Sequence, residues 1–430
     1  MNAEVKSFGR LKSIQRWSLL LLVAAGLVNY MDRSALAIAN PLIRKELGLS
    51  IAQMGLLLSA FVWAYALAQL PAGLLLDRMK PRLTLGFGLA LWSLAQAAGG
   101  FAGNLGQFIF ARAALGIGEA PMFPSAAATV RDWYPVERRA FPTGCWNCVS
   151  TLTPTVAPAL LTMIMLALGW RAMFVALGVA GLLLAVVWTV VYRDRSESAL
   201  TEREAAVLAE PGDEGRPMSL VLWGRLFRYR MTWGLLAGYF GVIYILWLFS
   251  SWLPGYLEIQ RHMSIRDSGL VSAIPFAFGV VGSISSGAVA DHLTRRGVSP
   301  IRSRKLIVGV SLMGMAVFTG LAAFADSSAL AVTEIAAAMF FNGCATSMAW
   351  AMVGVAAPRQ CVGSLGSIQN FGGYLGGASA PLVTGMLVQL NGDFRLALLT
   401  GAAFALLSCV AYMFIVPREP IAGLEQPRLA

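Results

Sequence analysis

The feature that most constrains this chain is its series of long apolar segments, each of which could cross a lipid bilayer. A spanning helix needs about 20 predominantly apolar residues, and we count twelve such segments along the 430 residues. Lipid offers the backbone no hydrogen-bond partners, so each segment is expected to form a helix. The predicted spans are 17–39, 53–76, 84–103, 106–130, 141–165, 171–192, 232–257, 268–290, 305–325, 329–352, 362–390 and 396–416. The pattern predicts an all-α membrane protein with twelve transmembrane helices.

A polar stretch in the middle of the chain separates six spans from six. We expect an N-terminal six-helix bundle over residues 1–192, a cytoplasmic linker over 193–231, and a C-terminal six-helix bundle with a short cytoplasmic tail over 232–430. Gly73-Leu-Leu-Leu-Asp77-Arg78 follows the second span of the first half, and Gly287-Ala-Val-Ala-Asp291-His292 follows the second span of the other. Internal repeats are common in secondary transporters, so the two bundles are predicted to be pseudo-symmetric.

The repeated motif places charges at the end of its helix. An aspartate followed by basic residues can bridge to the ends of neighbouring helices. We therefore predict a conformational latch on the cytoplasmic face, formed by Asp77 and Arg78 in the first half and by Asp291 and Arg295 in the second.

Composition supports a membrane location and argues against a nucleic-acid partner. Only 13% of the residues are charged, against about 25% in an ordinary soluble domain, and the mean hydropathy is +0.67. The net charge of +11 could suggest nucleic acid, but the basic residues lie in short loops between spans. Most of them fall on the side that holds both termini and the linker, which marks that side as cytoplasmic.

Metal, cofactor and enzyme chemistry find no support in the sequence. The five cysteines lie mostly in or beside apolar segments, and the only histidines are His262 and His292. Cys145 and Cys148 have C-x-x-C spacing, but there is no second pair. We find no nucleophile with a base, no phosphate-binding loop and no metal-ligand spacing. We therefore expect no metal, no cofactor and no enzymatic activity.

Two charged residues interrupt the first apolar segment. Asp32 and Arg33 would face lipid unless other groups accept them. An ionisable group in a spanning helix costs roughly 2.5–3.5 kcal/mol and usually faces the bundle interior, in a substrate or proton pathway. The alternative is that the pair marks the helix end, with Arg33 reaching the lipid headgroups. This stretch alone leaves both interpretations open.

Other fragments resemble a known family. The twelve spans, the repeated motif and Phe110-Ala-Arg112-Ala-Ala-Leu-Gly116-Ile-Gly118 resemble the major facilitator superfamily over essentially the whole chain. Three fragments narrow the resemblance to the anion:cation symporter family, which includes bacterial proton-coupled sugar-acid transporters and the animal sialin and vesicular glutamate transporters. They are Asn29-Tyr30-Met31-Asp32-Arg33, Gly116-Ile-Gly118-Glu119-Ala-Pro121-Met-Phe123-Pro124 and Asn370-Phe-Gly-Gly-Tyr374-Leu-Gly-Gly-Ala-Ser-Ala-Pro381.

The resemblance implies a function and a location. The expected fold is that of the superfamily, and the expected activity is proton-coupled uptake of an organic carboxylate by alternating access, with a sugar acid such as a hexonate or hexuronate as the leading substrate. Its partners would be the small organic anion, protons and the lipid bilayer. The protein is expected to work as a monomer in the bacterial inner (plasma) membrane, with both termini in the cytoplasm.

The resemblance also implies roles for three charged residues. The residues that match Asp32 and Glu119 carry coupling protons in that family, and the one that matches Arg33 binds the substrate carboxylate. Glu119 lies among Gly116, Gly118 and Pro121, where close helix packing and an interrupted helix leave room for a cavity. Burial there would favour its neutral form.

Several further residues are expected in the binding site. Asn29 and Tyr30 share a helix face with Arg33 through i,i+4 and i,i+3 spacing. Arg112 lies two helical turns before Glu119 and either contacts substrate or bonds backbone carbonyls of neighbouring helices. Other candidate substrate-binding residues are Ser150, Tyr244, Gln369, Asn370 and Tyr374. For Gln369 and Asn370, hydrogen bonding between helices is the alternative, and Trp252 is expected to be an interfacial anchor.

One departure from the family pattern leaves the substrate open. Galactonate-type members have a glutamine three positions after the fifth-span asparagine, whereas here Ser150 follows Asn147. A shorter side chain admits other organic anions, so an importer of aromatic or short-chain carboxylates is an alternative. An exporter of the same superfamily is a second alternative, although Pro154 and Pro158 replace the glycine-rich fifth span expected of one.

Overall fold

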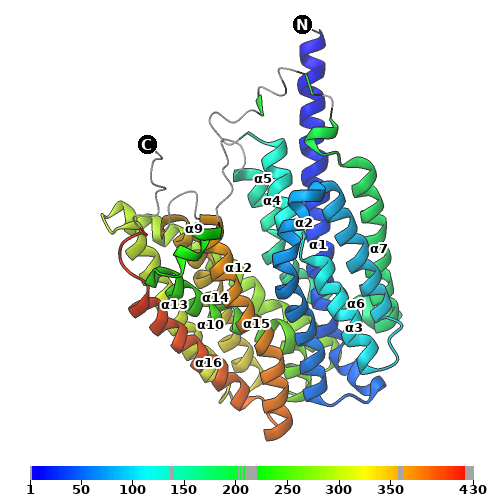
Figure 1. Cartoon of the computed structure of the whole chain (residues 1–430). Coiled ribbons are helices and arrows are strands. Elements are labelled where there is room, and N and C mark those ends of the chain that lie inside the picture. The colour runs from blue at the N-terminus through cyan, green and yellow to red at the C-terminus, as the bar shows by residue number, and fades with distance from the viewer. Residues whose placement is uncertain are drawn as a thin grey trace. The chain divides into compact units, whose positions relative to one another are not determined.

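The structure is a computed structural model that describes residues 2–135, 140–198, 200–201, 204, 207–208, 220–356 and 362–421. Every regular element in these ranges is a helix, which confirms the predicted all-α class (Figure 1). Nine helical segments within them are long and apolar enough to cross a membrane. The side chains of Asp77, Arg78 and Asn147 lie outside the described part.

Packing groups Met1–Leu49 with Ala60–Gly215 in a first compact unit, and Ser50–Ser59 with Arg216–Ala430 in a second. The elements up to the linker are α1 (Asn2–Leu47), α2 (Ile51–Gly99), α3 (Leu105–Glu119), α4 (Met122–Trp133), α5 (Ala140–Asn147), α6 (Val149–Leu168), α7 (Trp170–Val191) and η2 (Arg195–Glu197). The later elements are α9 (Leu220–Leu226), α10 (Arg230–Ile259), α11 (Ile265–Val271), α12 (Ala273–Arg295), α13 (Pro300–Ala322), α14 (Ser328–Ala356), α15 (Val362–Asn391), α16 (Arg395–Val410) and η4 (Ala411–Ile415). The domain boundaries at 192/193 and 231/232 stay a prediction.

The long element α2 contains two of the predicted spans. Lys80 interrupts it with φ 62° and ψ 167°, a conformation that residues other than glycine seldom adopt. Pro81 follows and has no backbone N–H to continue the helical hydrogen bonds. The helix is therefore kinked between the second and third predicted spans.

Turns divide three other predicted spans. The fourth consists of α3 and α4, separated at Ala120 and Pro121, and the fifth consists of α5 and α6, separated at Cys148. The eighth is interrupted at Ser272, between α11 and α12. All twelve predicted spans thus correspond to helical structure, as the fold class requires.

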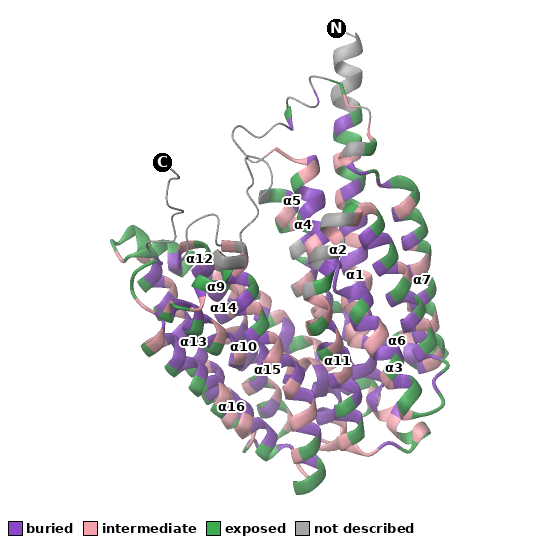
Figure 2. Cartoon of the chain, in the orientation of Figure 1, coloured by how far each residue is buried: buried purple, intermediate pink, exposed green. Residues whose placement is uncertain are grey.

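Large apolar side chains cover the outside of the helices. Phe110 is 77% exposed, Leu183 64% and Leu407 63%, and Figure 2 shows exposed positions along α7 and α16. Contiguous apolar surface of this extent would be a liability in water. Together with the apolar spans, it identifies a multi-pass membrane protein.

One sequence-based expectation is wrong. Trp252 is only 1% exposed, and its indole N–H donates to the carbonyl of Pro381 at 3.0 Å. A side chain that bonds a neighbouring helix in this way is part of the core of the second unit and not an interfacial anchor.

Candidate functional site

The charged pair of the first span lies well inside α1. This helix continues to Leu47, fourteen residues beyond Arg33, so the interpretation that the pair marks the helix end is wrong. Asp32 and Asn29 are fully buried, and Tyr30 and Arg33 are half-buried. The helix therefore carries one carboxylate and one guanidinium into the interior of the first unit.

Arg33 forms an ion pair with Glu119. Its Nε lies 2.7 Å from Glu119 Oε2, and the side chains are 10% and 0% exposed. Glu119 is the last residue of α3, directly before the turn at Ala120 and Pro121. The pair thus joins α1 to the point at which the fourth span is interrupted, and the residue proposed for the substrate carboxylate is held by the residue proposed to carry a proton.

Aromatic rings surround the guanidinium of Arg33. Its Cζ lies 5.0 Å from the ring centroid of Tyr30, 5.2 Å from that of Phe61 and 4.8 Å from that of Tyr65. The rings of Phe61 and Tyr65, one turn apart on α2, stack with their centroids 5.8 Å apart. Cation–π contacts are strongest when they are desolvated, so these rings hold the guanidinium without neutralising its charge.

Close packing between helices positions Glu119. A Cβ atom at Gly116 would lie 2.5 Å from the carbonyl oxygen of Phe61, and one at Gly118 would lie 2.6 Å from the backbone nitrogen of Trp92. Only glycine permits such an approach of α3 to α2. The two glycines therefore set the distance between Glu119 and the aromatic rings around Arg33.

Arg112 contacts the backbone of α1 and one of the rings around Arg33. It is 2% exposed, and its Nη1 donates to the carbonyl oxygen of Asp32 at 3.4 Å. Its Cζ lies 5.1 Å from the ring centroid of Phe61. This geometry corresponds to the carbonyl-bonding alternative that the sequence left open.

Asp32 has a different environment from Glu119. Both of its carboxylate oxygens are buried and accept no hydrogen bond from the described residues, and the charges of Glu119, Arg112 and Arg33 act on it electrostatically. A buried ion without hydrogen bonds is costly. The site therefore holds one carboxyl group that is paired and one that is not.

Ser150 belongs to the same cluster. It lies near the start of α6, and its side chain interacts with the hydroxyl of Tyr30. The ring of Tyr30 also meets that of Phe123 edge-on, with centroids 6.5 Å apart. The structure thus brings together Asn29, Tyr30, Asp32, Arg33, Arg112, Glu119 and Ser150.

The candidate residues of the second unit lie on α10 and α15. Tyr244 is fully buried against Phe404, with ring centroids 4.8 Å apart. Gln369 is also fully buried and accepts a hydrogen bond from Tyr412 at 3.5 Å. This bond corresponds to hydrogen bonding between helices, the alternative to a role of Gln369 in substrate binding. Asn370 and Tyr374 are half-buried. Their roles in substrate binding stay predictions.

The predicted latch is described only in part. Arg295 Nε donates to the carbonyl oxygen of Asp291 on its own helix, at 3.4 Å, and both residues are exposed. The side chains of Asp77 and Arg78 lie outside the described residues.

Arg82, which lies just after the first motif, makes several bonds that its place in the sequence does not reveal. Its guanidinium donates to the carbonyl oxygen of Thr189 at 2.8 and 3.0 Å and to Glu197 at 2.9 Å. Its backbone N–H donates to Asp194 at 3.1 Å. Arg82, four residues after Arg78 of the first motif, thus ties α2 to the end of α7.

The chain has known relatives over almost its whole length. The model of the Major Facilitator Superfamily matches residues 22–381. The chain is 42% identical over 414 residues to a protein of Escherichia coli (strain K12) named as a probable L-galactonate transporter, covering 96% of this chain and 91% of that protein. It is 32% identical over 417 residues to the D-galactonate transporter of Escherichia coli O6:H1, covering 93% and 95%.

Among solved structures, the fold is similar to that of a bacterial homologue of the human lysosomal transporter Spinster, in an inward-facing and unoccupied conformation. The TM-score is 0.77 at 17% sequence identity, and the match covers 94% of this chain and 97% of that one. At this identity the likeness concerns the fold alone.

Proposed function

Because the chain belongs to the Major Facilitator Superfamily, and is therefore a transporter and not an enzyme, we propose that it is a proton-coupled symporter that takes up an organic carboxylate by alternating access. The leading substrate class is the sugar acids, with a hexonate such as galactonate ahead of a hexuronate. The names of its relatives support this class, because two proteins that align over nearly the whole chain are described as galactonate transporters.

The observation that carries the proposal is the buried pair of Arg33 and Glu119. A guanidinium binds a carboxylate through a fork of parallel N–H groups, and Glu119 occupies part of that fork at 2.7 Å. A substrate carboxylate must therefore compete with Glu119 for Arg33. Protonation of Glu119 removes its charge and weakens its hold, so binding of the anion is favoured when a proton is bound.

Asp32 is the second proton carrier in this proposal. With Asp32 and Glu119 both ionised, the site would have to close around two buried carboxylates, which carries a desolvation penalty of several kcal/mol. Protonation of both leaves Arg33 and the substrate anion as the main charged pair. Transport of one anion with more than one proton moves net positive charge inward, which the membrane potential favours by about 2.3 kcal/mol per charge per 100 mV.

The remaining polar groups select the substrate. We assign Asn29, Tyr30 and Ser150 to the sugar hydroxyls nearest the carboxylate. In the second unit, Tyr244, Gln369, Asn370 and Tyr374 stay candidate substrate-binding residues. Arg112 supports the backbone of α1 at Asp32, on the evidence of its bond to that carbonyl. Importers of aromatic or short-chain carboxylates remain the runner-up, because Ser150 is shorter than the glutamine of galactonate-type relatives.

The protein would lie in the bacterial inner membrane as a monomer. The excess of Lys and Arg in the loops on one side supports an orientation with both termini in the cytoplasm. Uptake in this orientation brings the anion and the protons from the outside to the cytoplasm.

Uptake by the purified protein in liposomes tests the proposal. Labelled galactonate should accumulate above equilibrium when the outside is acidic, and an excess of unlabelled sugar acid should compete. Equal uptake with and without the pH gradient would show that protons are not coupled. Competition by aromatic or short-chain acids, but not by sugar acids, would favour the runner-up substrate class.

A further inference from the structure

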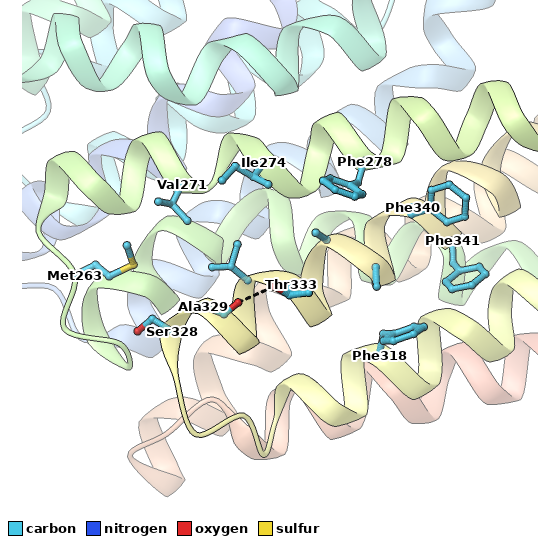
Figure 3. Close-up of a pocket in the computed structure, with 13 residues that line it drawn as sticks. Met263, Val271, Ile274, Phe278, Phe318, Ser328, Ala329, Thr333, Phe340 and Phe341 are labelled. Atoms are coloured by element: carbon cyan, nitrogen blue, oxygen red, sulfur yellow. Dashed lines mark hydrogen bonds between the residues drawn. The ribbon is translucent and has the colours of Figure 1, made fainter.

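A cavity of about 780 Å³ lies in the second unit, between α12, α13 and α14. Figure 3 shows Ile274 and Phe278 along one wall, Phe318 on the opposite wall, and Phe340 and Phe341 at one end. Its only side-chain hydroxyls are those of Ser328 and Thr333, and that of Thr333 already donates to the carbonyl of Ala329 at 2.8 Å. We call this cavity the lateral groove.

The lateral groove faces the bilayer. On α12, Ile274 and Phe278 of its wall are 44% and 48% exposed, and Val281 and Ile284 continue the same apolar stripe with 57% and 72%. On α13, Val317 beside Phe318 is 47% exposed. Exposed apolar side chains on both flanking helices place the opening of the groove among lipid chains.

The dimensions of the groove fit an acyl chain. Its wall on α14 runs from Ser328 to Phe341, about 20 Å at 1.5 Å per residue. One leaflet of a bilayer has roughly 15 Å of hydrocarbon, and the cavity volume lies within the 300–1,000 Å³ typical of ligand pockets. Apolar walls exclude water, and an empty groove would lose the dispersion contacts of its lining. Because the groove opens among lipid chains, an acyl chain is the molecule available to fill it.

Both signs of charge lie at the end of the groove marked by Met263 and Ser328. Arg261 is fixed there, because its Nε bonds the hydroxyl of Tyr256 and its Nη1 bonds the carbonyl of Ala325, each at 2.8 Å. Asp267 lies four residues after Met263, and Asp326 two residues before Ser328, and both are exposed. Arg266, beside Asp267 in the sequence, is exposed as well. Guanidinium groups and carboxylates near one end of the groove in the sequence suit a headgroup that carries a phosphate and an ammonium.

We propose that the lateral groove binds one zwitterionic phospholipid with a primary ammonium, of the phosphatidylethanolamine type. One acyl chain lies along α14, the phosphate meets Arg261, and the ammonium donates to Asp267 or Asp326. An acyl chain gains no hydrophobic free energy by moving from the bilayer to an apolar groove, so the headgroup provides the selectivity. In the orientation proposed above, this lipid belongs to the outer leaflet.

Native mass spectrometry of the purified full chain tests the proposal, with phosphatidylethanolamine, phosphatidylcholine and phosphatidylglycerol of identical acyl chains as probes. The wild type should retain one phosphatidylethanolamine about tenfold more tightly than either other lipid, a difference of about 1.4 kcal/mol. Ala337→Phe fills the groove and should remove that preference. Leu330→Phe is the matched control, since Leu330 lies on the same helix, is 45% exposed and is not in the wall.

A second variant tests the headgroup without altering the wall. Asp267→Asn keeps an acceptor for the hydroxyl of Ser264 but removes a charge, and should reduce the preference for phosphatidylethanolamine over phosphatidylcholine. Equal retention of all three lipids by the wild type, or unchanged retention in folded Ala337→Phe, would overturn the proposal. Loss of a dimer in Ala337→Phe would also overturn it, because the groove would then be an interface between copies of the chain.

Discussion

Two arginine–glutamate pairs in the first unit have nearly the same length and different surroundings. Arg33 and Glu119 lie 2.7 Å apart and are 10% and 0% exposed, while Arg171 and Glu46 lie 2.8 Å apart and are 37% and 48% exposed. Water solvates the second pair in either charge state. In the first pair, each charge depends on the other, so any change in the protonation of Glu119 changes what Arg33 can bind.

The exposed pair has a different purpose, which its other contacts make clear. Glu46 also accepts from the indole of Trp170 at 2.6 Å, and Arg171 donates to the carbonyls of Gly100 and Ala102, both at 2.9 Å. These bonds tie the end of α1 and the α2–α3 connection to the start of α7. The two pairs thus have nearly equal lengths, but only the exposed pair also bonds the connections between helices, and only the buried pair is shielded from water.

Removal of the buried cation should have the largest effect. Arg33→Gln leaves Glu119 buried without its cation, and loss of one partner of a buried ion pair typically costs 3–5 kcal/mol of stability. The substitution also removes the group proposed to bind substrate. We expect a large fall in the midpoint of thermal unfolding and no detectable sugar-acid uptake in liposomes. Stability should recover partly at acidic pH, where Glu119 is protonated; an Arg33→Gln variant with wild-type uptake would contradict the assignment.

A change in helix spacing should disturb the buried pair without touching it. Gly118→Ala places a methyl group against the backbone of Trp92, and overpacking of this kind costs about 1–3 kcal/mol. Displacement of α3 should move Glu119 away from Arg33 and weaken the pH dependence of uptake. Gly144→Ala, at a position where a Cβ meets no atom within 4 Å, is the control; equal behaviour of the two variants would show that spacing is unimportant.

The same chemical change at the exposed pair should have little effect. Glu46→Gln removes a charge that is largely solvated, so we expect a loss of stability of about 1 kcal/mol or less and proton-driven uptake at the wild-type level. Chemical or thermal unfolding in detergent measures the first quantity, and liposome uptake the second. A loss of coupling in this variant would contradict the distinction between the two pairs.

Replacement of Asp194, a buried carboxyl outside the spans, should have the smallest effect. It should change only how the stability of the protein depends on pH. Burial raises the pKa of Asp194, against the hydrogen bond from the backbone of Arg82. A carboxyl whose pKa is raised by folding stabilises the protein most below its unfolded pKa, near 3.9, and that contribution is lost as pH rises through the folded-state value.

The wild type should therefore lose slightly more stability between pH 4 and pH 7 than Asp194→Asn. Thermal unfolding of both proteins across that range measures the difference. Parallel curves would mean that Asp194 titrates alike in the folded and unfolded states.

Much of the fold could be predicted because bilayer thickness sets the length of apolar segments. The ends of helices were less predictable: α1 was expected over 17–39 and extends over Asn2–Leu47. Hydropathy marks where a segment enters lipid, but a helix continues into water as long as its residues permit. The kink at Lys80 and the turn at Ala120 and Pro121 lie at or next to a proline. The sequence could therefore have predicted their positions more precisely.

Only the ionisable residues of the site could be predicted from the sequence. Asp32, Arg33 and Glu119 stand out because charge is rare in a spanning helix, whereas Phe61 and Tyr65 are ordinary residues of an apolar segment. Their stacking under Arg33 depends on the approach of α2 to α1, which no local spacing encodes. The pairing of Arg33 with Glu119, 86 residues apart, likewise required the structure.

The most direct test of the account is the number of protons taken up when substrate binds. Isothermal titration of galactonate in buffers of different ionisation enthalpy measures this number for the wild type, Glu119→Gln and Glu46→Gln. We expect proton uptake on binding to the wild type and Glu46→Gln, and a smaller uptake with Glu119→Gln, whose affinity should also change less with pH. Equal proton uptake by the wild type and Glu119→Gln would contradict the claim that protonation of Glu119 frees Arg33 for the substrate.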